Sequence, residues 1–376
     1  TGTGYTDGFS QTTDYMESLD GGITPSAGFT GRYSLEDPFP DGIIRPSGRE
    51  LGLLTNVGRA VSFDGRQRPI PRTFQYSFGL QRRTLWNVLL DASYVGSQTV
   101  HDSVPYDMNF YRREAIEQGR AVANYMDRTI SNPFYGVLPS NATLGASATV
   151  AARELYRHLP GFQGITMQTN PWGRYRYDSL QLRAEKRFLG NRSKAGALTL
   201  IFSYTFSKNF QEKNRRNSWN LEEPVLHQLV SYDKPQNIAF SGVWDVPFGR
   251  RRALYRNPGR VMDKLVSGWT VNWIYRFTSG NPVPWMNVQF GCESYLVENQ
   301  TRDRWFNNDV SCYRSWPSYT YSNLPDRFPW LRQMDLSSAN VATSKTFTLT
   351  ERYRLNLRAE AFNITNSPYF GPPDTG

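Results

Sequence analysis

The stretch Tyr177–Ser207, YDSLQLRAEKRFLGNRSKAGALTLIFSYTFS, is the part of the sequence that says most about the fold. In its first arm the apolar residues occupy alternate positions: Leu180, Leu182, Ala184 and Phe188. The positions between them are polar: Gln181, Arg183, Glu185 and Arg187. After a turn at 189–196, the second arm repeats the pattern with Leu198, Leu200, Phe202, Tyr204 and Phe206. A period of two indicates strands with one apolar face, and arms of roughly 9–11 residues that end in aromatics are typical of membrane barrels. The stretch therefore predicts a hairpin of an outer-membrane β-barrel.

Working outward, the same alternation predicts four hairpins, at 73–97, 179–207, 237–278 and 336–363. Short turns join the strands within a pair, whereas the segments between pairs (98–178, 208–236 and 279–335) are long. Residues 1–72 are rich in Gly, Pro, Ser and Asp and are expected to be loop, and 112–126 is expected to hold a short helix. In an up-and-down sheet this order places every long loop at one end, as in outer-membrane barrels with long extracellular loops.

The predicted fold is therefore all-β, an antiparallel up-and-down transmembrane β-barrel segment. About eight strands are visible, and the whole chain, 1–376, is expected to be one partial barrel domain. Free edges at both ends of such a sheet invite aggregation unless more strands follow. Since the sequence opens without a recognisable signal peptide, we expect it to be a fragment of a longer protein.

Composition excludes some classes. Mean hydropathy is −0.58, and no apolar run approaches the roughly 18 residues of a spanning helix, so a helical membrane protein is excluded. The net charge is +10, but the basic residues are spread along the chain, so no nucleic-acid partner is expected. Aromatic residues make up 14%, which suits either a barrel or a carbohydrate-binding surface.

No catalytic, cofactor or metal site is expected, and the chain is not expected to be an enzyme. The histidines His101, His158 and His227 lie in different loops without the spacing of metal ligands. The sequence also lacks a G-x-S-x-G nucleophile elbow and a Gly-rich phosphate loop.

The two cysteines, Cys292 and Cys312, lie in one long loop. We predict a disulfide between them in an oxidising compartment, with two free thiols as the alternative. In the same loop Trp285, Trp305 and Trp316 are candidates for ligand contact, because indoles stack on sugars and peptides. A folded loop core accounts for them equally well.

Six charged residues are predicted to face the barrel lumen: Arg183, Glu185, Arg187, Arg354, Arg358 and Glu360. The interpretation that we favour is structural, with cross-strand ion pairs and contacts to a plug, because opposite charges on facing strands stabilise a sheet. The alternative is that they line a substrate path.

Five blocks in order carry a resemblance to a known family. They are PRTFQYSFGLQRRTLWNVLLDASYVGS (71–97), YDSLQLRAEKRF with LTLIFSYTFSKNF (177–210), NIAFSGVWDVPFGRRR (237–252), SGWTVNWIYRFTSGNPV (267–283) and RYRLNLRAEAFNITNSPYFGPP (352–373). Over most of 63–371 the chain resembles the C-terminal barrel half of Oar-like TonB-dependent receptors.

The resemblance implies a 22-stranded, plugged barrel in the outer membrane of a Gram-negative type of cell, which takes up a substrate with energy from TonB. The partners that it implies are outer-membrane lipid, an unidentified substrate (a peptide, a glycan or a chelate) and, through N-terminal parts outside this sequence, a plug domain and the TonB complex. The rival hypothesis is a secreted or surface-attached all-β adhesion or carbohydrate-binding protein, with its aromatics packed in a sandwich core.

Overall fold

A computed structural model gives the structure of the protein. It describes residues 36, 39, 42–43, 45–46, 48–66, 69–138, 144–188, 196–213, 215, 225–250, 252–255, 257–285, 288–320 and 326–374. Most of the predicted loop 1–72 and the turn at 189–195 lie outside these residues.

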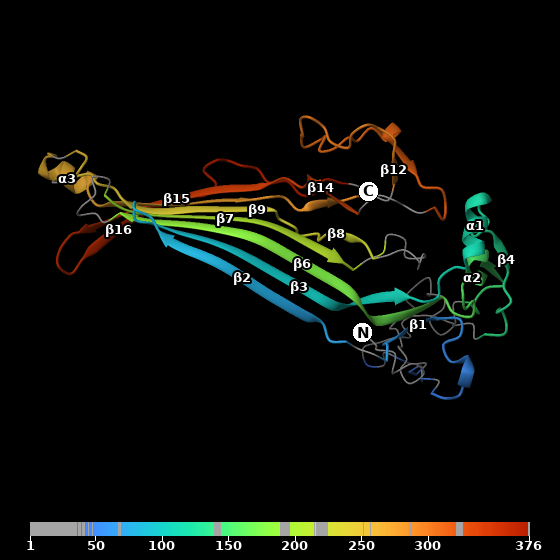
Figure 1. Ribbon diagram of the computed structural model, residues 1–376. Helices are drawn as coiled ribbons and strands as arrows, with labels where there is room; N and C mark the ends of the chain where they lie inside the picture. Colours follow the sequence, from blue (N-terminus) through green and yellow to red (C-terminus); the bar gives the residue numbers. More distant parts are fainter. Residues whose placement is uncertain are drawn as a thin grey trace.

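One long antiparallel sheet forms the body of the molecule (Figure 1). Its eight main strands lie side by side in chain order: β2 (Arg72–Arg83), β3 (Val88–Asp107), β6 (Gly164–Phe188), β7 (Ala197–Glu212), β9 (Gln236–Asp245), β10 (Trp269–Thr278), β15 (Leu336–Thr348) and β16 (Arg354–Ala361). The predicted all-β, up-and-down antiparallel fold is thereby confirmed. Within the described residues the sheet is open, because β2 and β16 are its edges and do not pair with each other.

Two short strands extend this sheet at its long-loop end. Strand β1 (Ala60–Phe63) pairs in parallel with β6, from Ala60 opposite Gly164 to Phe63 opposite Met167. Strand β8 (His227–Leu229) pairs with the end of β7. The prediction of loop for 1–72 and 208–236 is wrong at these strands and at η1 (Gly52–Leu54), since three or four residues are too few to show a period.

Strands β3 and β6 are 20 and 25 residues long, about twice what a membrane crossing needs. The predicted loop 98–178 is therefore wrong at both ends, because 98–107 and 164–178 are strand. Likewise β7 continues to Glu212. These extensions carry polar residues on both faces, so the alternation that marks a lipid-facing strand is missing although the ladder of hydrogen bonds continues.

The apolar alternates share one face of the sheet, and that face is uncovered. In the strand register Phe78, Tyr94, Leu180 and Phe206 lie opposite one another across β2, β3, β6 and β7. Their exposed fractions are 67%, 41%, 44% and 43%. The buried hydrophobic clusters of the described residues lie instead in the long connections. The sheet is thus a single layer without the packed core of a sandwich.

The connections divide between the two ends of the sheet. The long-loop end carries α1 (Arg113–Ala121), α2 (Ala152–Leu155), β4 (Thr129–Ser131) and β5 (Thr149–Ala151), while α3 (Arg260–Val266) lies at the short-turn end (Figure 1). The third long connection folds with β11 (Pro282–Pro284), β12 (Val288–Phe290), η2 (Val310–Cys312), β13 (Tyr313–Ser315) and β14 (Arg327–Arg332). The helix expected at 112–126 is shorter, at 113–121, and α3 was not predicted. No helix in the described parts of the chain has the length and apolar character needed to cross a membrane.

Candidate functional site

The face opposite the apolar one is polar along most of its length. One row across it joins Gln81, Asp91, Arg183, Ser203 and Ala239, and the next joins Leu89, Glu185, Ile201 and Ser241. Since directly opposed residues point to the same side, the charged positions predicted to face a lumen share this face with small polar residues.

The charges on β6 form a chain along the strand. Glu185 accepts from Arg187 Nη2 at 2.7 Å and from Arg183 Nη2 at 3.3 Å, and its side chain is only 15% exposed. The predicted cross-strand pairing of these residues is therefore wrong. Residues i and i+2 of a strand project from the same face, so long arginine side chains reach their own strand's carboxylate.

The same arrangement recurs on β16. Arg358 Nε donates to Glu360 Oε1 at 2.6 Å, again along the strand, and Arg354 lies on the same face nearer the short turn. The structure does not bring the two groups together. Four strands lie between β6 and β16, so at about 4.8 Å per strand they are roughly 24 Å apart along the sheet.

A shallow hollow of about 290 Å³ lies on the polar face between the two groups. Its lining includes Ile201, Val243, Ile274, Asn340, Glu360 and Phe362. No sequence pattern marks this hollow, because the apolar residues on this face interrupt the alternation at isolated positions.

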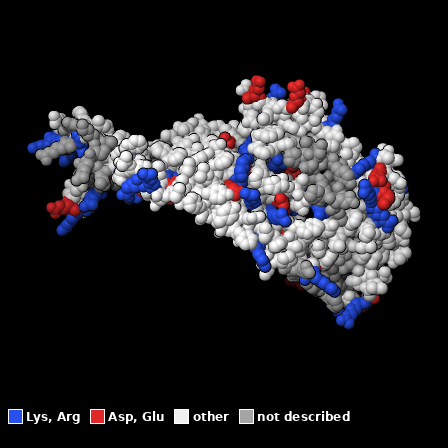
Figure 2. All heavy atoms as spheres, in the orientation of Figure 1, with Lys and Arg blue, Asp and Glu red and all other residues white. Residues whose placement is uncertain are grey.

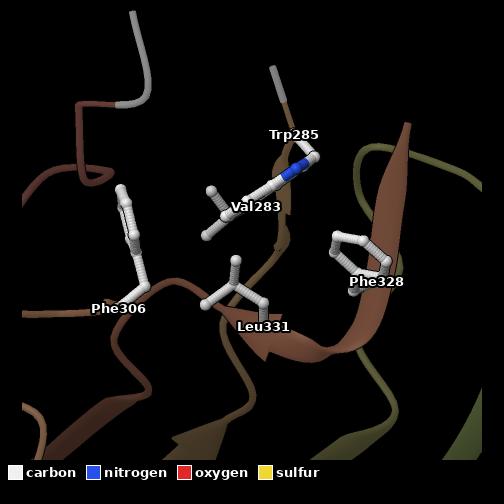
Figure 3. Packing of buried hydrophobic residues seen from close by; sticks show 5 residues of the cluster. All are labelled: Val283, Trp285, Phe306, Phe328 and Leu331. Carbon is white, nitrogen blue, oxygen red and sulfur yellow. The ribbon is translucent and has the colours of Figure 1, made fainter. Parts of the chain in front are cut away.

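The third long connection, 279–335, is a compact unit with its own core. Val283, Trp285, Phe306, Phe328 and Leu331 pack together (Figure 3). Trp285 is 8% exposed, and its ring contacts those of Phe306 and Phe328 edge-on at 5.6 and 5.5 Å. Trp285 is thus part of the loop core, and its prediction as a ligand contact is wrong. A tryptophan in a loop gives no sign of its burial in the sequence, since an irregular segment has no period.

Trp305 and Trp316 are only half-buried. Trp305 donates from Nε1 to the carbonyl of Arg332 at 2.6 Å and lines a hollow of about 310 Å³ with Arg302, Met334 and Phe370. Of the three predicted tryptophans, the structure therefore places Trp305 beside a concave surface.

Cys292 and Cys312 form a disulfide in the structure, with their Cα atoms 5.3 Å apart. Cys312 is buried, and the carbonyl of Cys312 accepts from the backbone N–H of Gly291 at 2.8 Å. Burial raises the pKa of Tyr313, the next residue, and Tyr295 of the same unit is affected in the same way. The cross-link therefore belongs to the folded part of this connection.

A buried ion pair joins the second and third long connections. Arg332 Nη2 donates to Asp233 Oδ2 at 2.7 Å, and Nη1 donates to the carbonyls of Asp233 and Gly280 at 2.8 and 3.1 Å. The Asp233 side chain is fully buried and that of Arg332 is 13% exposed. No local pattern in the sequence indicates this pair, because the two residues are 99 positions apart.

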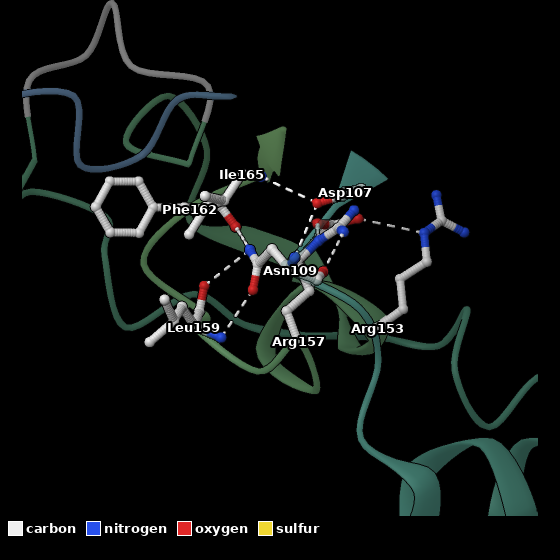
Figure 4. Close-up of polar contacts among 8 residues, drawn as sticks. Asp107, Asn109, Arg153, Arg157, Leu159, Phe162 and Ile165 are labelled. Carbon is white, nitrogen blue, oxygen red and sulfur yellow. Dashed lines mark hydrogen bonds and ion pairs between the residues drawn. The ribbon is translucent and has the colours of Figure 1, made fainter. Parts of the chain in front are cut away.

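The first long connection is held at its base by Asn109, which is fully buried (Figure 4). Its Nδ2 donates to the carbonyls of Leu159 and Phe162 at 3.0 and 2.6 Å, and its Oδ1 accepts from the N–H of Leu159 at 2.8 Å. Asp107 Oδ1 accepts from the N–H groups of Asn109 and Ile165 at 2.8 and 3.0 Å. These bonds hold together the two ends of a connection of more than fifty residues.

Further out, tyrosine and arginine side chains stack in this connection. The rings of Tyr125 and Tyr156 are 5.6 Å apart and nearly parallel, and the Arg128 guanidinium lies 4.0 Å from the Tyr125 centroid. The hydrogen bond from Tyr156 lowers the pKa of Tyr125, and Arg128 acts in the same direction. An ordered polar cluster of this kind presents a fixed surface at the loop end of the sheet.

The described residues contain no group of three or more His, Cys, Asp or Glu side chains that could hold a metal ion. His158 stacks on Phe110 and His227 on Phe210 at the loop end of the sheet.

The sequence from residue 2 to residue 376 matches the family model described as "Outer membrane beta barrel domain". The chain therefore belongs to this family of outer-membrane β-barrel proteins. Its location is the outer membrane, where lipid surrounds the apolar face of the sheet.

Among solved structures, the chain is similar to the outer membrane transporter YddB from Escherichia coli. The two are 13% identical with a TM-score of 0.39, and the alignment covers 83% of this chain and 31% of that one. This chain thus spans about a third of the transporter's length. No curated protein matches the sequence.

Proposed function

We propose that this chain is part of the barrel wall of an Oar-like, TonB-dependent receptor that takes up a substrate across the outer membrane. The observation that carries the proposal is that one single-layered sheet has an exposed apolar face and a polar face. The polar face carries ion-paired side chains along β6 and β16. In the complete barrel the polar face borders the lumen, because only the apolar face is compatible with lipid.

The long-loop end is the extracellular end in this proposal, since outer-membrane barrels carry short periplasmic turns and longer outer loops. The hollow beside Trp305 and the stacked cluster around Tyr125 then face the medium and are the proposed ligand contacts. Ordered loops suit capture, because a preformed surface loses less conformational entropy on binding. The chemistry is proposed to be uptake and not catalysis.

Sequence features that resemble the Oar-like receptors support the finer assignment, and energy coupling requires a plug and a TonB contact from outside this chain. The substrate is proposed to be a peptide, a glycan or a chelate. The rival adhesion or carbohydrate-binding hypothesis places the aromatic residues in a sandwich core, whereas the aromatic alternates of this sheet are exposed.

The test uses cells that make the complete protein, fed a mixture of oligopeptides, oligosaccharides and iron chelates. We expect at least one component to be depleted from the medium only when both the protein and TonB are present. Trp305→Ala should slow that depletion, while Trp330→Ala, at an exposed residue of the same connection, serves as the matched control. Equal depletion in strains without the protein or without TonB would refute the proposal.

A further inference from the structure

Helix α3 has an apolar side and a polar side. At about 100° per residue its apolar residues fall in one arc: Val261, Met262, Leu265 and Val266. The opposite arc is polar: Arg260, Asp263 and Lys264. Val261, Met262 and Leu265 are 75%, 45% and 54% exposed. The described parts of the protein therefore leave most of this apolar arc uncovered.

The end of α3 is bound to residues of the lipid-facing side of the sheet. Trp269 on β10 and Lys345 on β15 are partners in register. Trp269 is four residues before Trp273, and Lys345 is four residues after Val341, so each pair points to one face of its strand. Trp273 and Val341 lie in the same row across the sheet as the apolar residue Leu200. Their side chains therefore leave the sheet on its apolar side, where lipid lies.

Both side chains donate to carbonyls in the last turn of the helix or directly after it. Lys345 Nζ lies 2.5, 3.0 and 2.5 Å from the carbonyl oxygens of Lys264, Leu265 and Ser267. Trp269 Nε1 donates to the carbonyl of Leu265 at 2.9 Å. A cation that satisfies the free carbonyls of a helix C-terminus is also favoured by the helix dipole. These bonds hold the C-terminal end of α3 beside the apolar side of the sheet.

The polar side of α3 faces the preceding turn. Asp263 Oδ1 accepts from the N–H of Arg250 at 2.7 Å, and Gly249 adopts φ +117°, where a Cβ would meet Asp263 and Ser267. Arg252, Arg260 and Lys264 remain exposed around the helix. Figure 2 shows Lys and Arg atoms at the surface of this end of the molecule, with Asp and Glu atoms beside some of them. Around α3 itself the three exposed cations thus outnumber the one carboxylate, Asp263, which is bonded to the turn.

We propose that α3 is a membrane-interface anchor whose apolar arc enters the acyl boundary of the leaflet at the short-turn end, while Arg252, Arg260 and Lys264 bind the phosphates of anionic phospholipids. Two observations point to anionic phospholipid as the partner of α3. The apolar arc is continuous with the lipid-facing side of the sheet through Trp269 and Lys345, and the surrounding cations complement anionic headgroups. If the orientation proposed above holds, this is the periplasmic leaflet.

The first experiment measures where the apolar arc lies. A nitroxide is attached to Leu265→Cys, and in parallel to Lys264→Cys on the polar arc, in the full chain reconstituted in vesicles of phosphatidylethanolamine and phosphatidylglycerol. The parent, labelled without reductant, provides the blank, since its cysteines are cross-linked. We expect the label at 265 to be relaxed more by oxygen than by a water-soluble nickel chelate, and the label at 264 to show the reverse. Preferential relaxation of the label at 265 by nickel, or shielding from both reagents, would overturn the proposal.

The second experiment tests the charges. The chain is reconstituted with equal amounts of phosphatidylglycerol and phosphatidylcholine, and the lipid that it retains is measured by native mass spectrometry. Arg260→Gln/Lys264→Gln should lower the preference for phosphatidylglycerol by roughly fivefold for each cation. The control, Arg112→Gln/Arg314→Gln, removes two exposed cations at the other end of the sheet and should leave the preference unchanged. An unchanged preference in the α3 variant would show that the cations do not recognise the headgroup.

Discussion

At the scale of single residues, the ion pair between Asp233 and Arg332 holds two long connections together. The guanidinium makes bonds to a buried carboxylate and to two carbonyls, so it joins two long connections that the sequence keeps 99 positions apart. Removing one partner of such a pair leaves an uncompensated buried charge, which costs more than the pair itself contributes.

Arg332→Ala should therefore destabilise the folded unit 279–335 by about 3–5 kcal/mol. Hydrogen exchange of the backbone amides around Asp233 and Gly280 measures the effect. Arg314→Ala, which removes an exposed arginine from the same unit, is the control and should change exchange little. Protection that survives in Arg332→Ala would mean that the apolar core alone holds the two connections together.

Asp309 provides a prediction for pH. Its carboxylate accepts from the hydroxyl and the N–H of Ser311 at 2.8 and 3.0 Å, and these bonds lower its pKa below the ordinary 3.8. Because the folded pKa lies below the unfolded one, the contribution to stability is present at pH values above the unfolded pKa of 3.8 and is lost as the pH falls through the folded pKa. Carboxyl chemical shifts followed in an acid titration should show a low midpoint for Asp309, which Ser311→Ala should raise. A midpoint that the variant leaves unchanged would contradict this account.

At the scale of elements, the connection 279–335 is stabilised by its own core and by a cross-link. The disulfide encloses 20 positions of sequence and limits the unfolded chain. We expect mass spectrometry without reductant to find neither Cys292 nor Cys312 as a free thiol.

Removing this cross-link with Cys292→Ser/Cys312→Ser should weaken the unit by about 3 kcal/mol, measured as faster proteolysis within 279–335. The strands should unfold as in the parent, because the sheet does not depend on this loop. Proteolysis at the parent's rate would show that the aromatic core around Trp285 is sufficient.

A second prediction at this scale concerns the row that joins β9 and β10. Gly242 lies opposite Trp273, and a Cβ built on Gly242 would overlap the indole. Gly242→Ala should therefore force Trp273 from its position and cost about 1–3 kcal/mol, as overpacking does. The measurement is chemical unfolding in lipid vesicles. Gly291→Ala is the control, since the Cβ there would meet only the Cys312 carbonyl at 3.9 Å, an ordinary contact.

At the scale of the whole molecule, the sheet separates two environments. Leu182 points to the lipid side of β6, and Gln181, the adjacent residue, points to the polar side. An arginine on the lipid face near the middle of the membrane costs about 2–4 kcal/mol, whereas the polar face tolerates charge.

Leu182→Arg should therefore lower the free energy of unfolding in lipid vesicles by about 2–4 kcal/mol, and Gln181→Arg should have a much smaller effect. The two variants carry the same new charge one residue apart, so the difference between them reports the face. Equal losses would mean that both faces are equally apolar, contrary to the assignment of lipid and lumen.

The sequence alone indicated the four hairpins, the order of the main strands and the face on which the side chains of the alternating segments lie. Successive side chains of a membrane strand face lipid and lumen in turn. This local rule produces the alternating pattern of segments such as Leu180–Arg183 and Leu198–Phe206. The polar-face positions of Arg183, Glu185 and Arg358 follow from the same rule. Their ion-pair partners do not, because these depend on the distances between neighbouring side chains.

Other features depend on the tertiary structure, because no local periodicity of the sequence indicates them. The extensions of β3 and β6 beyond their alternating parts, the burial of Trp285 and the pairing of Asp233 with Arg332 all depend on segments that meet in space. The same is true of α3, whose seven residues are placed by Lys345, 81 positions from Lys264. The physical reason is that lipid imposes a repeating constraint on every crossing strand, whereas a loop outside the membrane is shaped by individual contacts between distant residues.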